Sequence, residues 1–433
     1  MEVSKRENVF KNLNFRLVFF GALVSELGAV LYNFAVSFYI LEISDNNAFL
    51  QGLYLAVCGI TLLVVTPLGG VIGDRYNKAK IMFICDYLKG ALIIITSVLM
   101  MFWSDAGAHI VLLFVLGTVG NIVSGIFNPA SGALLPDIVE EEKFQQANSY
   151  FSVKNSLLGI FGIILAGALY SAMPFNILFF VVGLCYIASG ISEMFIKYEH
   201  TPPTDEKFGI KVAIDDMKEG FVYLRSQKPV FIMVAAILFI NFFFSPISSN
   251  FVPYFVKTDV ASAPSYLFSG FLTPELWTSV FSTLMGLSSL IGSIVLSTRR
   301  QPEKIGRRVG FWLCLMAVQF VIDTAGYYIF VNRGISLNAF LILFSVRCFL
   351  LGIILTNVNI PINTYLMRAV EKNKLSKVTS IISVITQGFI PLASVLAGSV
   401  LQYLGSTVLL LICALGFVAT SVFMMTNREI RKI

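Results

Sequence analysis

Long apolar runs recur along the chain, and short segments that carry most of the charged residues separate them. A helix needs about 20 apolar residues to cross a lipid bilayer, and each run is long enough to do so. The pattern predicts twelve spans, at 17–41, 50–73, 81–103, 109–127, 149–172, 175–196, 229–256, 277–298, 309–331, 337–360, 376–402 and 405–426. Because the runs are continuous and do not alternate between apolar and polar positions, they exclude a membrane β-barrel. We therefore expect an all-α integral membrane protein.

The composition excludes a soluble globular enzyme. Of the 433 residues, 57% are apolar and 13% are charged, against about 45–50% and about 25% in soluble proteins. The first apolar run follows a leader of mixed charge and lacks a cleavage site of small residues, so we interpret it as a retained span. The six cysteines form no C-x-x-C pair and the two histidines lie far apart in the sequence. We therefore expect no disulfide framework, no metal site and no cofactor.

The net charge of +6 comes from an uneven distribution of basic residues between the spans. Of the 31 basic residues, only Lys257 and Arg333 fall on one side of the membrane, three lie inside spans, and the others fall on the opposite side. Basic residues concentrate on the cytoplasmic side of membrane proteins. The sequence thus predicts a multi-pass protein of the cell inner (plasma) membrane with both termini in the cytoplasm. The basic residues report this topology, so we expect no nucleic-acid partner.

Two short patterns occur twice at nearly the same separation. The Asn-Pro pair at 128–129 is predicted to close the fourth span, and the Ile-Pro pair at 360–361 closes the tenth in the same way, 232 residues later. The stretch 165–169 of the fifth span resembles 396–400 of the eleventh, 231 residues later. We interpret these repeats as a duplication of six spans, with chance similarity of apolar helices as the alternative. Two parallel six-helix halves are typical of secondary transporters whose substrate site lies between the halves.

This interpretation divides the chain into three parts. They are an N-terminal six-helix half at 1–197, a cytoplasmic linker at 198–228 and a C-terminal six-helix half at 229–433. Apolar residues of the linker recur at helical spacing, and three basic residues lie among them: Lys211, Lys218 and Arg225. We expect an amphipathic helix on the membrane surface, and a regulatory binding helix is the alternative.

The sequence gives little support for an enzyme. It has no G-x-x-x-x-G-K-[ST] phosphate loop, so uphill transport would have to use an ion gradient or a partner. His200 and Asp205 have the H-x-x-x-x-D spacing of some acyltransferases. They lie around Pro202 and Pro203 in the linker, where no apolar framework would hold the pair in register. We therefore do not expect enzymatic activity.

The most specific motif follows the second span, at 69–80, with the sequence GGVIGDRYNKAK. Its glycines would let two helices approach closely, its acid would cap or pair with a neighbouring helix end, and its basic residues would stay in the cytoplasm. The motif resembles the G-x-x-x-D-R-x-x-[RK] signature of the major facilitator superfamily. On this basis we expect a gating group formed by Gly70, Asp74, Arg75, Lys78 and Asp86.

Further stretches resemble one branch of that superfamily, the macrolide and drug exporters related to siderophore (enterobactin) exporters. These stretches are NFRL at 14–17, FNPA at 127–130, LLPD at 134–137, QAN at 146–148 and EGFVYL at 219–224. The resemblance implies a fold of two pseudo-symmetric six-helix halves. It also implies a secondary transporter that exports amphipathic compounds as a proton antiporter and so confers antibiotic resistance. We expect a monomer whose partners are a small amphipathic substrate, protons and membrane lipid.

The chain departs from the family pattern at three positions. Ile163 follows Gly162 where the antiporter motif of span five usually has Gly-Pro, so the kink that a proline would supply is expected to be missing. Ala29 stands where many relatives have an aspartate, and Gly120 stands where an arginine is common. An acid occurs one turn before Ala29, as Glu26.

Charged residues inside the bilayer are costly, at about 2.5–3.5 kcal/mol each near its centre. We take six residues as such charges, the acids Glu26, Asp86 and Asp323 and the bases Lys89, Lys154 and Arg347. Asp86 and Lys89 lie three residues apart on one helix and can pair with each other or with Arg75. Asp323 and Arg347 reach depths that differ by about 6 Å. Adjacent antiparallel helices can therefore form an intramembrane ion pair from them, structural or gating, with a role as substrate ligands as the alternative.

Glu26 is predicted to lie about 14 Å into the first span, near the midplane, with no basic partner on its turn. Lys154, only five residues into its span, is expected to extend to the membrane interface. A lone carboxylate in a low dielectric favours its protonated form. Glu26 is therefore our candidate for coupling to protons or to a cationic substrate. The alternative is a neutral Glu26 hydrogen-bonded to Ser25, Asn33 or another helix.

Taken together, these patterns predict export of amphipathic small molecules by alternating access, coupled to protons. A dedicated exporter of an endogenous siderophore, peptide or lipid-like metabolite is the first alternative. A membrane receptor or sensor that transports nothing is an alternative from another class. The apolar residue types that line a transport cavity also face lipid, so the pattern does not name the substrate.

Overall fold

The computed structural model of the chain describes residues 8–103, 105–197, 218, 221–297, 305–370, 375–427 and 430. Within these residues all regular structure is helical. Twelve of the helices or continuous helix runs are long and apolar enough to cross a membrane. The predicted all-α fold with twelve membrane spans is therefore confirmed. The predicted amphipathic linker helix is described in part, since residues 218 and 221–226 are helical, whereas Lys211, His200 and Asp205 lie outside the described residues.

The internal contacts divide the chain into two compact units. Unit 1 is drawn from Met1–Val36 and Ile60–Ala213, and unit 2 from Ser37–Gly59 and Ile214–Ile433. The first two membrane helices therefore contribute to both units. The halves at 1–197 and 229–433 describe a proposed duplication, and they stay a prediction.

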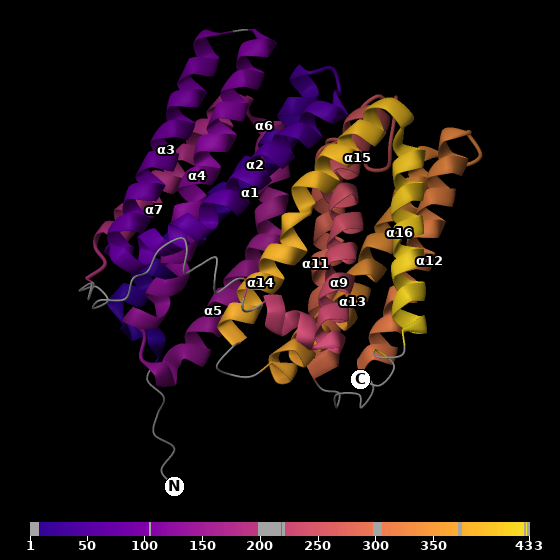
Figure 1. The fold of residues 1–433 in the computed structure, drawn as a ribbon. Coiled ribbons are helices and arrows are strands. Elements are labelled where there is room, and N and C mark those ends of the chain that lie inside the picture. Colours follow the sequence, from indigo (N-terminus) through magenta and orange to yellow (C-terminus); the bar gives the residue numbers. More distant parts are fainter. Residues whose placement is uncertain are drawn as a thin grey trace. The chain divides into compact units, whose positions relative to one another are not determined.

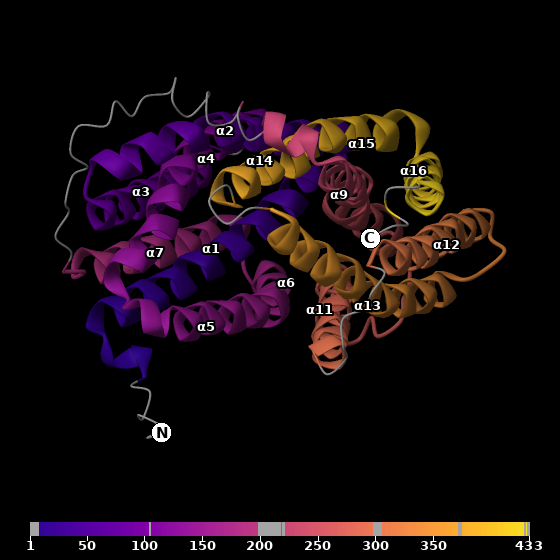
Figure 2. The ribbon, with the colours of Figure 1, turned by 60° about the horizontal axis from the view of Figure 1, so that its bottom comes forward.

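Unit 1 is built around three helices that pack along one another (Figures 1 and 2). Of these, α3 packs along both α4 and α7. Asn77 caps α3 by accepting a hydrogen bond from the backbone N–H of Lys80, and Asp105 caps α4 in the same way. The helices of unit 1 are α1 (Leu13–Ile43, as far as Val36), α2 (Ala48–Arg75, from Ile60), α3 (Lys78–Phe102), α4 (Ala106–Ile138), α5 (Phe144–Leu157), α6 (Ile163–Ala172) and α7 (Phe175–Met194).

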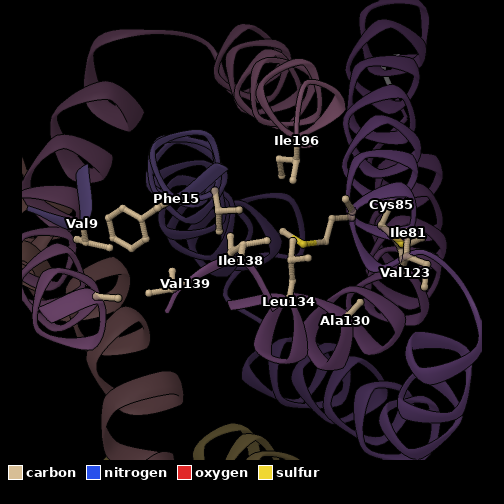
Figure 3. Close-up of a cluster of buried hydrophobic side chains, with 14 residues drawn as sticks. Val9, Phe15, Ile81, Cys85, Val123, Ala130, Leu134, Ile138, Val139 and Ile196 are labelled. Atoms are coloured by element: carbon tan, nitrogen blue, oxygen red, sulfur yellow. The ribbon is translucent and has the colours of Figure 1, made fainter. Parts of the chain in front are cut away.

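A cluster of buried apolar side chains fills one end of unit 1 (Figure 3). It joins Phe15 of α1 to Cys85 of α3 and Leu134 of α4, and it includes Val9, from the short helical turn η1 (Val9–Lys11) before α1. Its members are less than a tenth exposed. Each fully buried side chain of this size contributes about 1.5–3 kcal/mol. The cluster therefore fixes the amino-terminal ends of α1 and α3 against the carboxy-terminal end of α4.

Unit 2 contains the remaining helices and the turn between α1 and α2. Its helix α12 packs along α13 and α16, and α11 packs along α13 (Figure 2). A continuous helix run from Lys228 to Val260 includes two π-helical segments, η4 and η5. The bounds are α9 (Lys228–Pro246), η4 (Ile247–Phe251), α10 (Val252–Phe255), η5 (Val256–Val260), α11 (Leu276–Ser297), α12 (Ile305–Val331), α13 (Leu337–Ala369), α14 (Leu375–Gly388), α15 (Ile390–Leu404) and α16 (Ser406–Thr426).

Within unit 2, the beginning of α2 packs backbone to backbone against α15. A Cβ atom at Gly52 would overlap the carbonyl oxygen of Ser394, and one at Gly398 would overlap that of Ala48. The backbone N–H of Ala48 also donates a hydrogen bond to Oε1 of Gln402 at 2.9 Å. Only glycine permits this approach, because any other residue would force the helices apart.

Two helices continue past the prolines that were predicted to end them. Pro129 lies inside α4, which runs to Ile138, and Pro361 lies inside α13, which runs to Ala369. The predicted ends of the fourth and tenth spans are therefore wrong. A proline removes one backbone hydrogen bond, and packing against neighbouring helices and local adjustments can compensate for this loss in membrane helices.

A π-helical turn, η3 (Leu158–Gly162), lies between α5 and α6. It occupies the place where the family pattern has Gly-Pro, and here Ile163 continues directly into α6. A π turn accommodates one residue more than an α turn and is often found at functional sites. The helix is therefore irregular at this position without a proline. The other short helical element of unit 1, η2 (Glu141–Lys143), precedes α5.

Candidate transport site

A cavity of about 260 Å³ lies inside unit 1, between residues of α1, α2, α3, α4 and α7. Tyr32 and Tyr186 contribute aromatic faces to it. Its other polar lining residues carry hydroxyl, amide or charged groups: Ser25, Glu26, Asn33, Asp86, Lys89, Asn121, Ser124 and Asn128. Polar groups inside membrane helices are costly and usually serve binding or transport. This cavity is therefore the candidate site.

Glu26 lines the cavity, but it is not the lone carboxylate that the sequence predicts. Its Oε1 accepts a hydrogen bond from Nζ of Lys154 on α5. The amide nitrogen of Asn155, in the orientation that satisfies both polar atoms of its side chain, donates to Oε2 at 3.2 Å. The prediction of a lone carboxylate is therefore wrong, because the basic partner comes from another helix and not from the same turn of α1. About half of its side chain (47%) stays exposed.

Lys154 does not extend to the membrane interface, and that prediction is also wrong. Only 2% of the residue is exposed, and its ammonium lies 4.8 Å from the centre of the Phe151 ring. The reason is the start of α5, which begins at Phe144 instead of 149. Lys154 therefore lies about 15 Å into the helix, at 1.5 Å per residue, and reaches the level of Glu26.

Asp86 and Lys89 both line the cavity, yet the structure does not join them in an ion pair. Lys89 instead donates a hydrogen bond to Oγ of Ser124 at 2.8 Å, and its ammonium lies 4.7 Å from the centre of the Tyr186 ring. Asp86 is 3% exposed, and its Oδ2 accepts no hydrogen bond from the described residues. The expected pairing of Asp86 with Lys89 or Arg75 is therefore not observed.

Sequence analysis missed one acidic residue, Glu193, in the sixth span. This residue lies near the end of α7 and is completely buried, and neither carboxylate oxygen accepts a hydrogen bond of good geometry from the described residues, although the Ser189 hydroxyl lies close. It interacts electrostatically with Asp86 of α3. The signal was present in the sequence, since Glu193 falls within the predicted span 175–196. Counting it would have given four acids against three bases.

The motif at 69–80 is helical as far as Arg75 and forms a turn only at Tyr76 and Asn77. The close helix approach occurs at Gly69, where a Cβ would overlap the carbonyl oxygen of Gly125 of α4, whereas Gly70 faces open space. The close helix approach predicted from the glycines is therefore present at Gly69 and absent at Gly70. Arg75 is exposed, and the side chain of Asp74 lies outside the described part of the structure.

The last basic residue of the signature, Lys78, connects two helix ends. Its Nζ lies 2.5 Å from Oδ2 of Asp137 and donates a hydrogen bond to the carbonyl oxygen of Ala133 at 3.3 Å. Asp137 belongs to the last turn of α4, so the contact holds the start of α3 against the end of α4. Asp86 lies two turns further along α3, in the cavity, and does not take part. The structure thus separates Asp86 from the other members of the expected gating group.

In unit 2, the structure brings Asp323 of α12 and Arg347 of α13 together. Arg347 Nε lies 2.6 Å from Asp323 Oδ2, and the two side chains are 6% and 2% exposed for the arginine and the aspartate. The guanidinium lies between two aromatic rings, 4.6 Å from the centre of Phe320 and 4.7 Å from that of Phe344. Gln319 donates a hydrogen bond to the carbonyl oxygen of Arg347 at 2.6 Å. The pair is buried among aromatic side chains of unit 2.

This fold and the polar cavity inside a membrane domain agree with a comparison of the whole chain with known families. A model of the Major Facilitator Superfamily matches residues 18–387. The chain belongs to this superfamily. Its members found in the comparisons are transporters, so the chain is a multi-pass membrane transporter and not an enzyme.

Several superfamily members resemble the chain over much of its length. The uncharacterized MFS-type transporter YkuC of Bacillus subtilis (strain 168) is 24% identical over 86% of this chain and 82% of its own. Macrolide efflux protein A of Streptococcus pyogenes is 23% identical over 55% and 58%. The staphyloferrin A transporter of Staphylococcus aureus (strain NCTC 8325 / PS 47) is 21% identical over 47% and 49%.

A solved structure supports the fold. The crystal structure of a bacterial homologue of the iron transporter ferroportin, in its inward-facing state, has a TM-score of 0.70 to this chain. It is 16% identical in sequence, and the match covers 96% of this chain and 100% of that one. At this identity the likeness concerns the fold, and it agrees with the major facilitator fold expected from the motif at 69–80.

Proposed function

We propose that this transporter exports amphipathic small molecules, of the drug or macrolide type, across the plasma membrane by alternating access in exchange for protons. The observation that carries the proposal is the position of Glu26. Its carboxylate is half-exposed at a cavity inside the membrane domain and is held by one buried base, Lys154. The similarity to a macrolide efflux protein supports export as the direction.

The geometry suggests how a proton and a substrate would compete at this site. Glu26 is neutralised by Lys154, so a cationic substrate that reaches the carboxylate must displace the ammonium or share the carboxylate with it. Protonation of Glu26 would remove its negative charge and weaken any bound cation. Because Glu26 is half-exposed, solvent screens the pair and breaking it costs less than breaking a fully buried pair. A protonated carboxyl group carries no charge to attract a cation, so a proton and a cationic substrate compete for Glu26.

Glu26→Gln tests the proposal directly, because it keeps the shape of the side chain and removes the charge. Purified protein in lipid vesicles would be given radiolabelled erythromycin and, separately, ethidium, with and without a pH gradient, while an internal dye reports proton movement. We expect the variant to lose pH-driven transport of both probes. Glu140→Gln is the matched control, because Glu140 is exposed and pairs with Lys143 in the segment after α4. Unchanged flux and unchanged proton movement in Glu26→Gln would refute the proposal.

A second candidate is export of one endogenous metabolite, such as a siderophore, a peptide or a lipid-like compound. The polar lining of the cavity favours a siderophore among these, since amides and hydroxyls such as Asn121, Asn128 and Ser124 suit a ligand rich in oxygen atoms. The similarity to a staphyloferrin A transporter agrees with this candidate. Vesicles that transport staphyloferrin A but neither erythromycin nor ethidium would favour it over drug export.

We also propose the topology and assembly that the sequence predicts, with both termini in the cytoplasm and a monomeric transporter surrounded by lipid. In this orientation the contact between Lys78 and Asp137 lies on the cytoplasmic side and acts as a gate between α3 and α4. A reporter enzyme fused after Ile433 should be active only if the C-terminus is cytoplasmic. Activity of a periplasmic or extracellular reporter at the same position would contradict the topology.

A further inference from the structure

Two buried carboxyl groups lie between α3 and α7 in unit 1, beside the cavity. Asp86 is 3% exposed and Glu193 is not exposed at all. The two groups interact electrostatically with each other, and the Ser189 hydroxyl lies close to both. Yet Asp86 Oδ2, both oxygens of Glu193 and the Ser189 hydroxyl have no hydrogen bond of good geometry with the described residues. Buried polar groups without such partners are rare in folded proteins and call for an explanation.

The basic side chains of unit 1 that lie inside the membrane do not neutralise both acids. Lys154 is paired with Glu26. Lys89 interacts electrostatically with Asp86, but its hydrogen bond goes to Ser124 and its ammonium lies over the Tyr186 ring. Three buried or cavity-lining acids, Glu26, Asp86 and Glu193, thus face two bases within the described part of this unit. One negative charge remains without a counter-charge.

Repulsion between neighbouring carboxylates favours the uptake of one proton. Two like charges repel each other more strongly in the low dielectric of a protein interior than in water, so ionising both neighbouring groups is less favourable than ionising one. One added proton removes the repulsion and leaves a single carboxylate beside Lys89. The group of three would then be electrically neutral.

We propose that Asp86 and Glu193 form a proton-binding site in which the two carboxyl groups share one proton, and that this proton exchanges with the cavity through Asp86. Asp86 lines the cavity, whereas Glu193 lies behind it with no exposed surface. Release is a simple dissociation: the carboxyl O–H bond breaks, its electron pair stays on the oxygen, and the proton passes to water in the cavity. Two carboxylates and the Lys89 ammonium remain, and the site is ready to bind a proton again.

Other groups around the pair fit this assignment. On α3, the thiol of Cys85 interacts with both carboxyl groups and also packs in the apolar cluster of unit 1 (Figure 3). On α7, the phenol of Tyr186 faces Lys89. On α1, a Cβ at Gly21 would lie 3.4 Å from both Cγ of Glu193 and Oγ of Ser189, so a glycine backbone covers the pair there.

Two further titratable groups lie nearby. Glu26, the acid of α1 at the cavity, is already neutralised by Lys154. Cys185 of α7 interacts electrostatically with Tyr186. Neither supplies the missing positive charge, so the negative charge at Asp86 and Glu193 is left for a proton to neutralise.

Infrared spectroscopy of the full-length protein in lipid vesicles tests the site without a transported substrate. A protonated carboxyl group gives a carbonyl band that shifts in D₂O and disappears on deprotonation. We expect the wild-type protein to show the band of one buried carboxyl group at neutral pH and to lose it at alkaline pH. Asp86→Asn and Glu193→Gln should each abolish the band, because a single carboxyl group then remains, no like charge repels its ionised form, and Lys89 is the base left to balance it. Glu140→Gln is the control and should keep the band, because Glu140 is exposed and pairs with Lys143 away from the site.

The role of this proton site in transport rests on the proposed function. The experiment distinguishes failure of the proton site from failure of the proposed function. A band that persists in Asp86→Asn or in Glu193→Gln would overturn the shared proton, as would the absence of a band in the wild type. Unchanged probe flux in Glu26→Gln would refute Glu26 as the coupling residue but would leave the band intact. If a variant does not fold, wild-type protein labelled with ¹³C in aspartate or in glutamate gives the answer. A shared proton requires the band to respond to both labels, and a response to one label alone contradicts it.

Discussion

Removing one partner of the ion pair in unit 2 should destabilise the protein far more than removing both. Asp323→Leu leaves the guanidinium of Arg347 buried without its carboxylate, and breaking such a pair from one side costs about 3–5 kcal/mol. Arg347→Met leaves the carboxylate unpaired at the same cost. It also removes the contacts of the guanidinium with the rings of Phe320 and Phe344, which are worth up to about 2 kcal/mol each.

The double variant removes both charges and with them the cost of keeping them out of water. Replacing a buried ion pair by apolar residues of similar size is often neutral or stabilising by about 1–4 kcal/mol. This gain is similar in size to the loss of the two ring contacts. We therefore expect the free energy of unfolding of the double variant to lie within about 2 kcal/mol of the parent's value. Each single variant should lose about 3 kcal/mol or more of that free energy.

Equilibrium unfolding in mixed micelles with a rising fraction of sodium dodecyl sulfate, followed by tryptophan fluorescence, measures these differences. The reasoning is refuted if the losses in the two single variants simply add in the double variant, because the two residues would then not interact. Probe transport in vesicles distinguishes the two roles left open by the sequence. A double variant that is stable and transports marks a structural pair, and one that is stable but inactive marks a substrate or gating role.

Two further predictions concern contacts at helix ends and crossings. Lys78→Ala should lower stability by no more than about 1 kcal/mol, because its pair with Asp137 is partly exposed, but should slow probe transport several-fold. The exchanged pair, Lys78→Asp with Asp137→Lys, should restore the rate, and a rate that stays low would show that the ion pair is not what matters. Gly398→Val should force α15 away from Ala48 and cost about 1–3 kcal/mol. A cysteine at Ala48 should then react faster with a membrane-impermeant reagent, and unchanged reactivity would count against the close contact.

The sequence predicts the number of membrane helices well, because the spans are long and strongly apolar. Helix ends are harder to predict. The chain stays helical past Pro129 and Pro361, where a rule drawn from soluble helices predicts an end. The second span also stays helical to Arg75, two residues past its predicted end at 73. In a membrane the cost of exposing backbone groups keeps the helix intact through residues that would break it in water.

The candidate site was only partly predictable. Glu26 was identified as a membrane carboxylate, and Asp323 and Arg347 were matched by their depths. Lys154 was not matched to Glu26, because an error of five residues at the start of α5 moved it by about 8 Å along the helix axis. Contacts between helices distant in sequence depend on helix rotation and packing. The pattern of apolar residues in a single sequence does not determine either of these.

The extra residue in η3 (Leu158–Gly162) gives the α5–α6 run a means of rotation that a proline would not provide. One added residue offsets the side chains on either side of the turn by about 100°, the angle that each residue of an α-helix occupies. If the wide turn moved toward the N-terminus, one peptide unit at a time, the backbone would stay hydrogen-bonded while Lys154 swung around the axis. Migration of the π turn along the helix would thus move the Lys154 ammonium away from Glu26 without unfolding the helix.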